Sequence, residues 1–329
     1  MKFQGVKIAG TGSYVPEKVL TNEDLSEIVD TSDEWIFTRT GIKERHIAAD
    51  DQFTSDLSSE AAKEALENAG IKAEDLQLII VATLSPDKTF PNTASLVQNK
   101  IGAPNAACFS MEAGCTGFVY GLEVGAGMIA SGLYKNALII GAEKLSSVVD
   151  WTDRTTCVLF GDGAGAAILT ATDVENNKYL GSDLGSNGEQ HDILHIPGGG
   201  CAVPFSQEAK DQKLLTLQMN GKEVFKHAVN GMSVSAKKAL DQSGLSIDEI
   251  DWVVAHQANV RIINAVGQKV GVPTEKVYIN VDRFGNTSAA SVPIAFNEMR
   301  QKGLLKRGQK ILFVAFGGGL TWGASVVEY

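Results

Sequence analysis

Cys115 lies at a point in the sequence where a nucleophile can be generated. It follows a β-rich segment over residues 106–111 and precedes an apolar run with a helical pattern over residues 118–130. A thiol at the N-terminus of a helix faces unpaired backbone N–H groups and the positive end of the helix dipole. Both favour the thiolate, the form that attacks a carbonyl carbon. Because free cysteine is among the most buried residue types, a purely structural cysteine is the alternative interpretation.

His256 and Asn286 are two further groups with useful chemistry. His256 ends a strand predicted over residues 250–255, and Asn259 can cap the helix that follows it and stops at Gly271. Asn286 stands in the segment 285–291, which opens another predicted helix. Taken alone, a strand-end histidine and a helix-capping asparagine are the simpler interpretations.

The helix after Cys115 contains four glycines, at positions 117, 121, 125 and 127. Each glycine costs up to about 1 kcal/mol in a helix relative to alanine. Such a helix is expected to be buried, with other backbone packed closely against it.

The elements that would position these groups come from an internal repeat. Residues 76–82 correspond to 250–256, residues 113–116 to 284–287, and residues 132–135 to 303–306. The clearest hinge lies at 175–178, which predicts an N-terminal half over residues 1–173 and a C-terminal half over residues 174–329. Because duplication brings equivalent points together around a pseudo-two-fold axis, we expect Cys115, His256 and Asn286 to meet in one pocket.

Strands alternate with helices along the chain, which is typical of α/β proteins with mainly parallel sheets covered by helices. Further strands are predicted over residues 6–9, 76–83, 137–142, 166–169, 179–184, 277–281, 311–315 and 324–327. Further helices are predicted over residues 22–29, 55–68, 92–100 and 221–240, and Pro293 is expected to interrupt the helix after Ser291.

Three other segments have competing interpretations. Residues 10–16 lack the third glycine of a dinucleotide-binding motif and are expected to form a loop. Residues 160–166 lack the Lys-Ser/Thr pair of a phosphate loop, which favours close strand packing. Residues 31–42 are dense in Trp, Arg and hydroxyl groups. They form either a surface loop with a half-buried Trp or a site where Trp and Arg hold a planar ring and its phosphates.

Composition limits the class of protein. The 329 residues are 44% hydrophobic and 21% charged, as in soluble globular proteins. The net charge of −10 argues against general nucleic-acid binding but permits a local basic patch. The four cysteines lack CxxC pairs and neighbouring histidines, so a zinc site or a disulfide framework is not expected. Residues 1–6 show no signal-peptide pattern, and no uninterrupted apolar run reaches membrane-spanning length, which predicts a cytoplasmic protein.

Six segments together resemble the thiolase-fold condensing enzymes, and more narrowly the bacterial β-ketoacyl-acyl-carrier-protein synthase III family. They are residues 31–42, 113–118, 161–166, 256–259, 285–291 and 316–319, in the order and at the spacing of that family. Asn286 stands where elongating synthases have a second histidine, which favours the initiating branch and the plant-type polyketide synthases. The resemblance implies an α/β thiolase-like fold of two duplicated halves, with layered mixed sheets and helices (αβαβα).

The resemblance also implies a mechanism. Cys115 would take an acyl group, expected to be acetyl, from acyl-CoA as a covalent intermediate. His256 would ease its deprotonation. Malonyl-acyl carrier protein would then lose its carboxylate, and His256 Nε2 and the Asn286 amide would stabilise the resulting enolate. Backbone N–H groups of Cys115 and Gly318 would hold the tetrahedral oxyanion. No metal or redox cofactor is required, and acyl-CoA is a substrate.

Substrate-binding residues follow from the same resemblance. Trp35 and Arg154 would stack the CoA adenine, Thr31 would touch the base, and Arg39 would face the phosphates. The pantetheine tunnel would be lined by Gly221, Phe225 and Asn259, and the acyl pocket by Phe90, Phe316 and Leu320. Phe90 would reach across a homodimer into the partner's pocket. An acidic carrier protein would dock on Lys222, Lys226, Arg261 and Lys269, although ordinary solvated cations are the alternative.

Two departures from the family bear on the primer. Residues 189–217 are long and irregular, and Leu320 replaces an aromatic residue that is often seen after the glycine run. Both are expected near the acyl pocket or the tunnel mouth, where they would affect the length and branching of the acyl group. The rival functions are a related acyl-CoA/malonyl condensing enzyme of a secondary-metabolite or signalling pathway and an inactive paralogue that serves as a binding subunit. A degradative thiolase is disfavoured because its second cysteine is missing.

Overall fold

The computed structural model describes residues 3–329; Met1 and Lys2, part of the segment expected to lack a signal peptide, lie outside this range. The first sheet contains β1 (Gly5–Tyr14), β4 (Leu78–Ala82), β5 (Ala107–Met111), β6 (Asn136–Glu143) and β7 (Gly163–Thr172). The second contains β8 (Tyr179–Ser186), β11 (Trp252–Ala255), β12 (Lys310–Gly317) and β13 (Thr321–Glu328).

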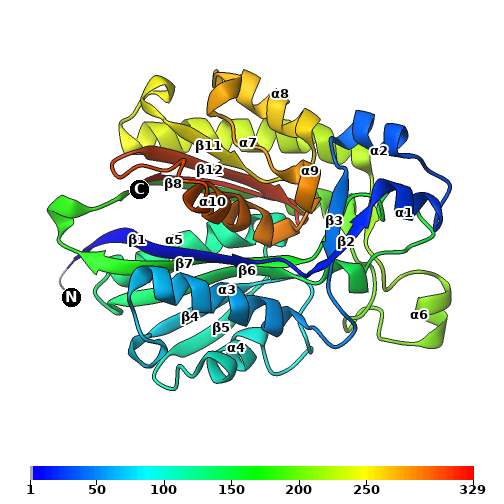
Figure 1. Ribbon diagram of the computed structural model, residues 1–329, viewed down its shortest axis with the longest axis horizontal. Helices are drawn as coiled ribbons and strands as arrows, with labels where there is room; N and C mark the ends of the chain where they lie inside the picture. Colours follow the sequence, from blue (N-terminus) through cyan, green and yellow to red (C-terminus); the bar gives the residue numbers. More distant parts are fainter. Residues whose placement is uncertain (1–2) are drawn as a thin grey trace.

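The two sheets lie in layers separated and covered by helices (Figure 1). The main helices are α3 (Thr54–Ala69), α4 (Thr93–Ile101), α5 (Gly117–Ala130), α7 (Gly221–Ser243), α8 (Val260–Val270) and α10 (Ser291–Gln301). α3 and α4 cover the outer face of the first sheet, α7 and α8 cover the second, and α5 and α10 lie between the sheets and contact both. This αβαβα layering confirms the predicted fold class.

The repeat is visible in the strand pairing. The order β1-β7-β6-β4 in the first sheet matches β8-β13-β12-β11 in the second. In each set two antiparallel pairs are followed by one parallel pair. The sheets are therefore mixed, and the prediction of mainly parallel strands is wrong. β6 and β7, like β12 and β13, succeed each other without the crossover helix that a parallel pair requires.

The prediction of a strand over residues 277–281 is also wrong. The equivalent strand of the first half, β5, pairs in parallel with β4 along five residues. In the second half only Val277 bridges to Val253, and Tyr278 N–H donates to the Val253 carbonyl. Asn280 N–H donates instead to the Gln257 side chain at 2.9 Å. A buried side chain thus replaces the ladder partner, and the chain turns into α9 (Val281–Phe284).

Residues 10–14 belong to β1, so the loop predicted there is wrong. A Cβ atom added at Gly10 would lie 2.5 Å from the backbone nitrogen of Ala69 in α3. The glycine permits the helix to sit directly on the strand.

Close strand packing at residues 160–166 is confirmed, since a Cβ atom at Gly165 would lie 2.7 Å from Pro293. Pro293 itself lies in the first turn of α10, where a missing N–H costs no helical hydrogen bond, so it does not interrupt the helix.

The glycines of α5 have two different environments. Added Cβ atoms would lie 2.7 Å from Ala82 at Gly117, 2.9 Å from Ile139 at Gly121 and 2.6 Å from Ile139 at Gly125. The helix is therefore held close to the first sheet by sheet side chains rather than by backbone. Gly127 has no atom within 4 Å of such a position, so the packing explanation fails there.

Smaller elements gather at one end of the layers (Figure 1). They are α1 (Asn22–Ser26), α2 (Asp33–Thr40), α6 (Gln207–Asp211), β2 (Lys18–Thr21), β3 (Glu44–Ile47), β9 (Leu194–His195) and β10 (Gln218–Met219). α2 occupies the segment for which a loop was one expectation: Ser32 caps it by accepting from Trp35 N–H, and Gly41 ends it. The remaining predicted helices and strands are present, with ends shifted by a few residues.

Single turns of 3-10 helix complete the chain. They are η1 (Ala73–Asp75), η2 (Gly114–Thr116), η3 (Leu145–Ser147), η4 (Val174–Asn176), η5 (Gly188–Gln190), η6 (Ile247–Glu249), η7 (Thr274–Lys276) and η8 (Ser288–Ala290). η2 precedes α5 and η8 precedes α10, so the turns lie at equivalent points of the two halves.

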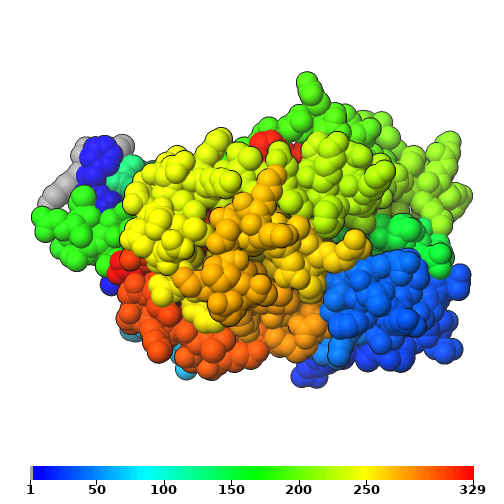
Figure 2. All heavy atoms as spheres, turned by 90° about the horizontal axis from the view of Figure 1, so that it is seen from above, coloured from blue at the N-terminus to red at the C-terminus, as the bar shows by residue number. Residues whose placement is uncertain are grey.

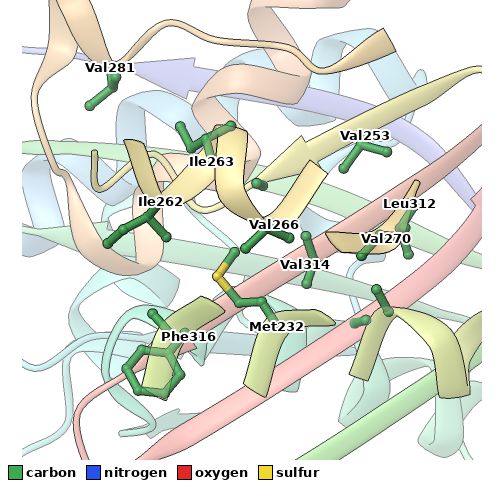
Figure 3. Packing of buried hydrophobic residues seen from close by; sticks show 14 of the residues in the cluster. Met232, Val253, Ile262, Ile263, Val266, Val270, Val281, Leu312, Val314 and Phe316 are labelled. Carbon is green, nitrogen blue, oxygen red and sulfur yellow. The ribbon is translucent and has the colours of Figure 1, made fainter. Parts of the chain in front are cut away.

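The core of the second half lies between α7, α8 and the second sheet. Met232 of α7 packs among Val266 of α8, Val314 of β12 and their neighbours (Figure 3). Farther toward the start of α7, Val224 and Phe225 are only half-buried and line a cavity. The apolar stripe of α7 therefore serves two purposes: part of it fills the core, and part forms the wall of the site described next.

Candidate active site

A cavity of about 860 Å³ brings the three candidate catalytic residues together. Cys115 comes from η2, His256 from the end of β11, and Asn286 from the segment before η8; all three line the cavity. All are nearly inaccessible to solvent. The expected convergence of the two halves is present, although Asn286 stands two residues before η8 whereas Cys115 lies within η2.

The backbone around Cys115 is held by close approaches to the end of β12. A Cβ atom at Gly317 would lie 2.5 Å from Cys115 N, and one at Gly114, where φ is +53°, would lie 2.9 Å from Gly318 N. Only glycine permits both approaches. They place the backbone nitrogens of Cys115 and Gly318, the two expected oxyanion donors, beside each other at the cavity wall.

The protonation of Cys115 differs from the sequence expectation. Burial raises the pKa of its thiol to about 12, and the nearby carboxylates of Glu143 and Glu112 add to the rise. A hydrogen bond with Ser288 and the backbone N–H act in the opposite direction. Desolvation therefore acts against the thiolate, which the helix N-terminus is expected to favour.

His256 is held as a neutral hydrogen-bond donor. Its Nδ1 lies 2.6 Å from Ser291 Oγ, which also accepts from Gln257 N–H. Among residues 3–329 the Ser291 hydroxyl has only Nδ1 as an acceptor, so Ser291 donates to Nδ1 and the ring proton resides on Nε2. Burial lowers the pKa of His256 to about 3. The imidazole is therefore a weak base, and its Nε2–H is directed away from Ser291 toward the cavity.

Asn286 is oriented by its own backbone neighbours. Its N–H donates to Leu159 at 2.8 Å, and its carbonyl accepts from Gly161 N–H at 3.0 Å. Its Oδ1 accepts from Ser288 N–H at 2.9 Å. Because that bond fixes the oxygen side of the amide, the NH₂ group faces the cavity. The capping hydrogen bond from Ser288 N–H, which was the simpler alternative to a catalytic role, therefore orients the Asn286 side chain.

The opposite end of the cavity is framed by two guanidinium groups around Trp35. Arg39 lies 4.5 Å and Arg154 lies 5.1 Å from the centre of the indole ring. Arg154 also donates to the Asp30 carbonyl at 2.9 Å. Gly221, Phe225 and Asn259 line the cavity too. Thr31 does not line it; its hydroxyl is buried and has no hydrogen-bond partner among the described residues.

The four cations expected to bind carrier protein divide into two pairs. Lys222 and Arg261, at the starts of α7 and α8, line the cavity, whereas Lys226 and Lys269 do not. Lys226 lies 3.6 Å from Glu223, and Lys269 donates to Asn230 at 2.9 Å. Figure 2 shows the surface of α8, in gold, beside the blue N-terminal segment that contains α2.

Only one of the three expected acyl-pocket residues borders the cavity. Phe316 lines it, Leu320 is packed into the core cluster, and the Phe90 side chain is 87% exposed. Within one chain, therefore, neither Leu320 nor Phe90 forms this wall.

Sequence reasoning missed several residues of the site. Ser288 and Ser291 lie inside the segment 285–291 but were assigned no role. The irregular connection is not among them: residues 191 and 194–196 belong to the stretch expected near the acyl pocket or the tunnel mouth, and they form part of the cavity wall, as expected. Glu143 does not line the cavity, but it carried one usable signal: a carboxylate that follows the six buried apolar or glycine residues 137–142 in the same strand.

Comparisons with known proteins agree with this architecture. Residues 109–188 match the family model of 3-oxoacyl-[acyl-carrier-protein] synthase III, and residues 240–329 match the model of its C-terminal part. The chain is 53% identical over 327 residues to a beta-ketoacyl-[acyl-carrier-protein] synthase III of Clostridium acetobutylicum, covering 99% of both proteins.

Solved structures give the same result. The crystal structure of 3-oxoacyl-[acyl-carrier-protein] synthase III from Aquifex aeolicus superposes with a TM-score of 0.91 at 48% identity, covering 99% of this chain and 100% of that one. The priming β-ketosynthase of the R1128 polyketide pathway has a TM-score of 0.92 at 31% identity, covering 99% and 97%. Within residues 3–329, no helix combines the length and hydrophobicity needed to span a bilayer.

Proposed function

The chain belongs to the bacterial β-ketoacyl-[acyl-carrier-protein] synthase III family, and from this premise we propose that its reaction runs through Cys115, His256 and Asn286. It is an acyltransferase that initiates fatty-acid synthesis by condensing an acyl-CoA primer with malonyl-acyl carrier protein. The observation that carries the assignment of residues is the single cavity lined by all three side chains.

The first half-reaction is acyl transfer to Cys115. The thiolate attacks the thioester carbonyl of acyl-CoA, and the backbone N–H groups of Cys115 and Gly318 bind the oxyanion that forms. CoA leaves, and the acyl group stays on the sulfur. The primer is acetyl-CoA, and the reaction uses no cofactor.

The second half-reaction is decarboxylation and condensation. Loss of carboxylate from the malonyl unit leaves an enolate oxygen that needs donors but no proton. His256 Nε2–H and the Asn286 amide are two neutral donors already oriented by Ser291 and Ser288. A weakly basic imidazole suits this role. It stays neutral and donates a hydrogen bond from Nε2, and it places no positive charge in the buried site.

CoA enters over Trp35, with its adenine between Trp35 and Arg154, Thr31 near the base and Arg39 toward the phosphates. A planar base inserted between two groups needs about 7 Å, twice the usual van der Waals separation. Arg154 lies 5.1 Å from the ring centre and therefore shifts outward by about 2 Å on binding. Gly221, Phe225 and Asn259 line the path of the pantetheine.

Carrier protein docks beside the same mouth, on Lys222 and Arg261 first and on Lys226 and Lys269 farther out. The chain's net charge of −10 makes a local cationic face necessary for an acidic partner. The half 1–173 supplies the nucleophile and part of the CoA site. The half 174–329 supplies the two hydrogen-bond donors and the docking face.

The chain acts as a homodimer in which the exposed Phe90 completes the acyl pocket of its partner. This placement accounts for a phenylalanine side chain that is 87% exposed in one chain.

Intact-protein mass spectrometry after exposure to acetyl-CoA tests the assignment. Wild type gains one acetyl group, whereas Cys115→Ala gains none and forms no condensation product. Cys157→Ala, which removes another buried thiol outside the cavity, is the matched control and labels normally. Acetyl transfer to a second cysteine in Cys115→Ala would show that the nucleophile is elsewhere.

A further inference from the structure

A fully buried guanidinium group has no role in the mechanism above. Arg45, in β3, is 0% exposed. Its Nη1 donates to the Leu20 carbonyl at 3.1 Å and to Asn22 Oδ1 at 2.9 Å. Its Nη2 donates to the Val158 carbonyl at 2.7 Å. Among residues 3–329 Arg45 forms no ion pair, and its Nε has no hydrogen-bond partner.

A buried positive charge of this kind is costly. A guanidinium taken out of water loses solvation energy, and buried charges in proteins are normally paired with an opposite charge. The acceptors of Arg45 are two carbonyl groups and an amide oxygen, all of them neutral. Since even a well-paired buried charge is weak evidence for a role in stability, the groups that Arg45 holds are the better guide to its role.

One of these groups leads directly to Asn286. Val158, which accepts from Arg45, is followed by Leu159, whose carbonyl accepts from Asn286 N–H at 2.8 Å. Gly161 N–H in turn donates to the Asn286 carbonyl at 3.0 Å. Both of these backbone hydrogen bonds of Asn286 therefore go to the segment that Arg45 holds at its first peptide group.

The stem of Arg45 packs against the same junction. A Cβ atom added at Gly161 would lie 3.1 Å from Arg45 Cβ and 2.5 Å from the Phe284 carbonyl oxygen. One added at Gly285, where φ is +62°, would lie 3.1 Å from Arg45 Cβ and 2.9 Å from the Leu159 carbonyl oxygen. Arg45 thus lies against both chain segments at the glycines that let them approach each other.

The other end of the guanidinium is held by Asn22, at the start of α1. The buried Asn22 side chain accepts from Arg45 through Oδ1, and its Nδ2 donates to Asp33 Oδ1 at 2.8 Å and to the Ile42 carbonyl at 2.7 Å. Asp33 is the first residue of α2, and Ile42 follows the residue that caps its end. Arg45 therefore links the two ends of α2 to the segment that holds Asn286.

Building on the proposed function, we propose that Arg45 is a positioning residue for the enolate donor Asn286. Its guanidinium fixes the Val158–Leu159 peptide group against α1 and α2, and this group sets where the Asn286 amide meets the enolate. Arg45 itself does not line the cavity. A displacement of about 1 Å, caused far from the chemistry, can cost about 100-fold in rate. The step affected is decarboxylation, because acetyl transfer uses Cys115 and backbone donors.

The test compares the two half-reactions in Arg45→Met, which keeps the stem and removes the guanidinium. Malonyl-carrier-protein decarboxylation, measured without primer, should fall by about 10- to 100-fold. Single-turnover acetyl transfer to Cys115 at saturating acetyl-CoA should stay within about threefold of wild type.

A double-mutant cycle with Asn286→Ala separates positioning from general structural damage. If Arg45 acts through Asn286, Arg45→Met causes no further loss of decarboxylation once the amide is absent, whereas independent effects multiply. Arg45→Lys keeps the charge but offers one nitrogen where arginine offers a fork, so it should lose less decarboxylation than Arg45→Met. If Arg45→Met does not fold, as judged by urea unfolding, the same cycle is run with Arg45→Lys.

Arg300→Met is the matched control, because it makes the same substitution outside the cavity. Arg300 donates to Glu64 at 2.6 Å and to Asn297 at 3.0 Å, and neither acceptor lines the cavity. This variant should keep both half-reactions within about twofold of wild type.

The proposal is overturned if Arg45→Met slows both half-reactions by the same factor, or if its loss of decarboxylation is undiminished in the Asn286→Ala background. These outcomes leave the proposed function standing, because Cys115 is still labelled and Asn286→Ala is still slow. Failure of the proposed function has a different signature: label persists in Cys115→Ala, or Asn286→Ala decarboxylates at the wild-type rate.

Discussion

Replacing Ser291 by alanine separates the two half-reactions, because Ser291 sets the tautomer of His256. The hydroxyl donates to Nδ1 at 2.6 Å and accepts from Gln257 N–H at 3.2 Å. Alanine removes the donor to Nδ1, and the ring proton is then free to move from Nε2 to Nδ1. The enolate loses one of its two side-chain donors in every molecule that adopts the wrong tautomer.

The size of the effect follows from the bond that is lost. A neutral intramolecular hydrogen bond contributes about 1 kcal/mol, up to about 1.5, which shifts a tautomer ratio about 5- to 10-fold. Decarboxylation of malonyl-carrier protein should slow by up to about that factor, and by the full factor where the wrong tautomer predominates in the variant. Acetyl transfer to Cys115 should change by less than about twofold, since burial makes His256 a weak base. The buried Gln257 N–H, left without a partner, should lower the free energy of unfolding by about 1–3 kcal/mol.

The assay pairs kinetics with a direct view of the ring. Decarboxylation and acetyl transfer are measured separately, and ¹⁵N NMR of the histidine side chains reports which nitrogen of His256 carries the proton. Ser291→Thr keeps a hydroxyl and should restore both the tautomer and most of the rate. An unchanged tautomer accompanied by slower decarboxylation would refute the reasoning, as would equal losses in the two half-reactions.

Four further predictions test other parts of the structure. Asn286→Asp should lose decarboxylation by about 100- to 1000-fold, because a carboxylate repels the enolate, with a much smaller loss of acetyl transfer; separate assays of the two half-reactions decide. Gly317→Ala should impair both half-reactions and lower the unfolding midpoint in urea, because the added Cβ atom would lie 2.5 Å from Cys115 N. Gly127→Ala, where the added Cβ atom has open space around it, should leave the unfolding midpoint unchanged or raise it. Arg261→Glu should raise the apparent KM for malonyl-carrier protein more than that for acetyl-CoA, with an effect that fades as salt is added; equal changes in both constants would contradict a docking role. Although burial acts to raise it, hydrogen bonds from Arg283 and Lys302 hold the pKa of Glu298 at about 2, below the ordinary 4.5. The stabilising contribution of this carboxylate is complete above about pH 4.5 and is lost as pH falls toward 2. The difference in unfolding free energy between wild type and Glu298→Gln, measured in urea, should therefore shrink over that pH window.

Much of the fold could be predicted because its signals are local. Asn92 and Asn259 cap their helices by accepting backbone N–H groups, and Gly70 and Gly271 end theirs in the left-handed conformation. Each signal operates within a few residues of the chain. The repeat could be recognised for a similar reason, since equivalent elements recur in the same order in both halves.

Strand direction and strand loss could not be predicted from local signals. Whether β6 pairs parallel or antiparallel with its neighbours depends on how the chain returns to the sheet. The strand expected at residues 277–281 is reduced to one bridge because Gln257, more than 20 residues earlier, takes the Asn280 N–H. A competing hydrogen-bond acceptor so far away in the sequence does not change the hydrophobic periodicity of residues 277–281.

The sequence by itself determined which atoms are present at the site: a thiol, an imidazole and an amide at equivalent or adjacent points of a repeat. Only the tertiary structure decided their proton states. Burial raises the pKa of Cys115 to about 12 and lowers that of His256 to about 3. It also raises the pKa of Glu143 to about 7. The Ser288 hydroxyl, 145 positions from Glu143 in the sequence, donates to that carboxyl group at 3.1 Å. Solvation and electrostatic energies depend on distances through space, and those distances exist only once the two halves have packed together.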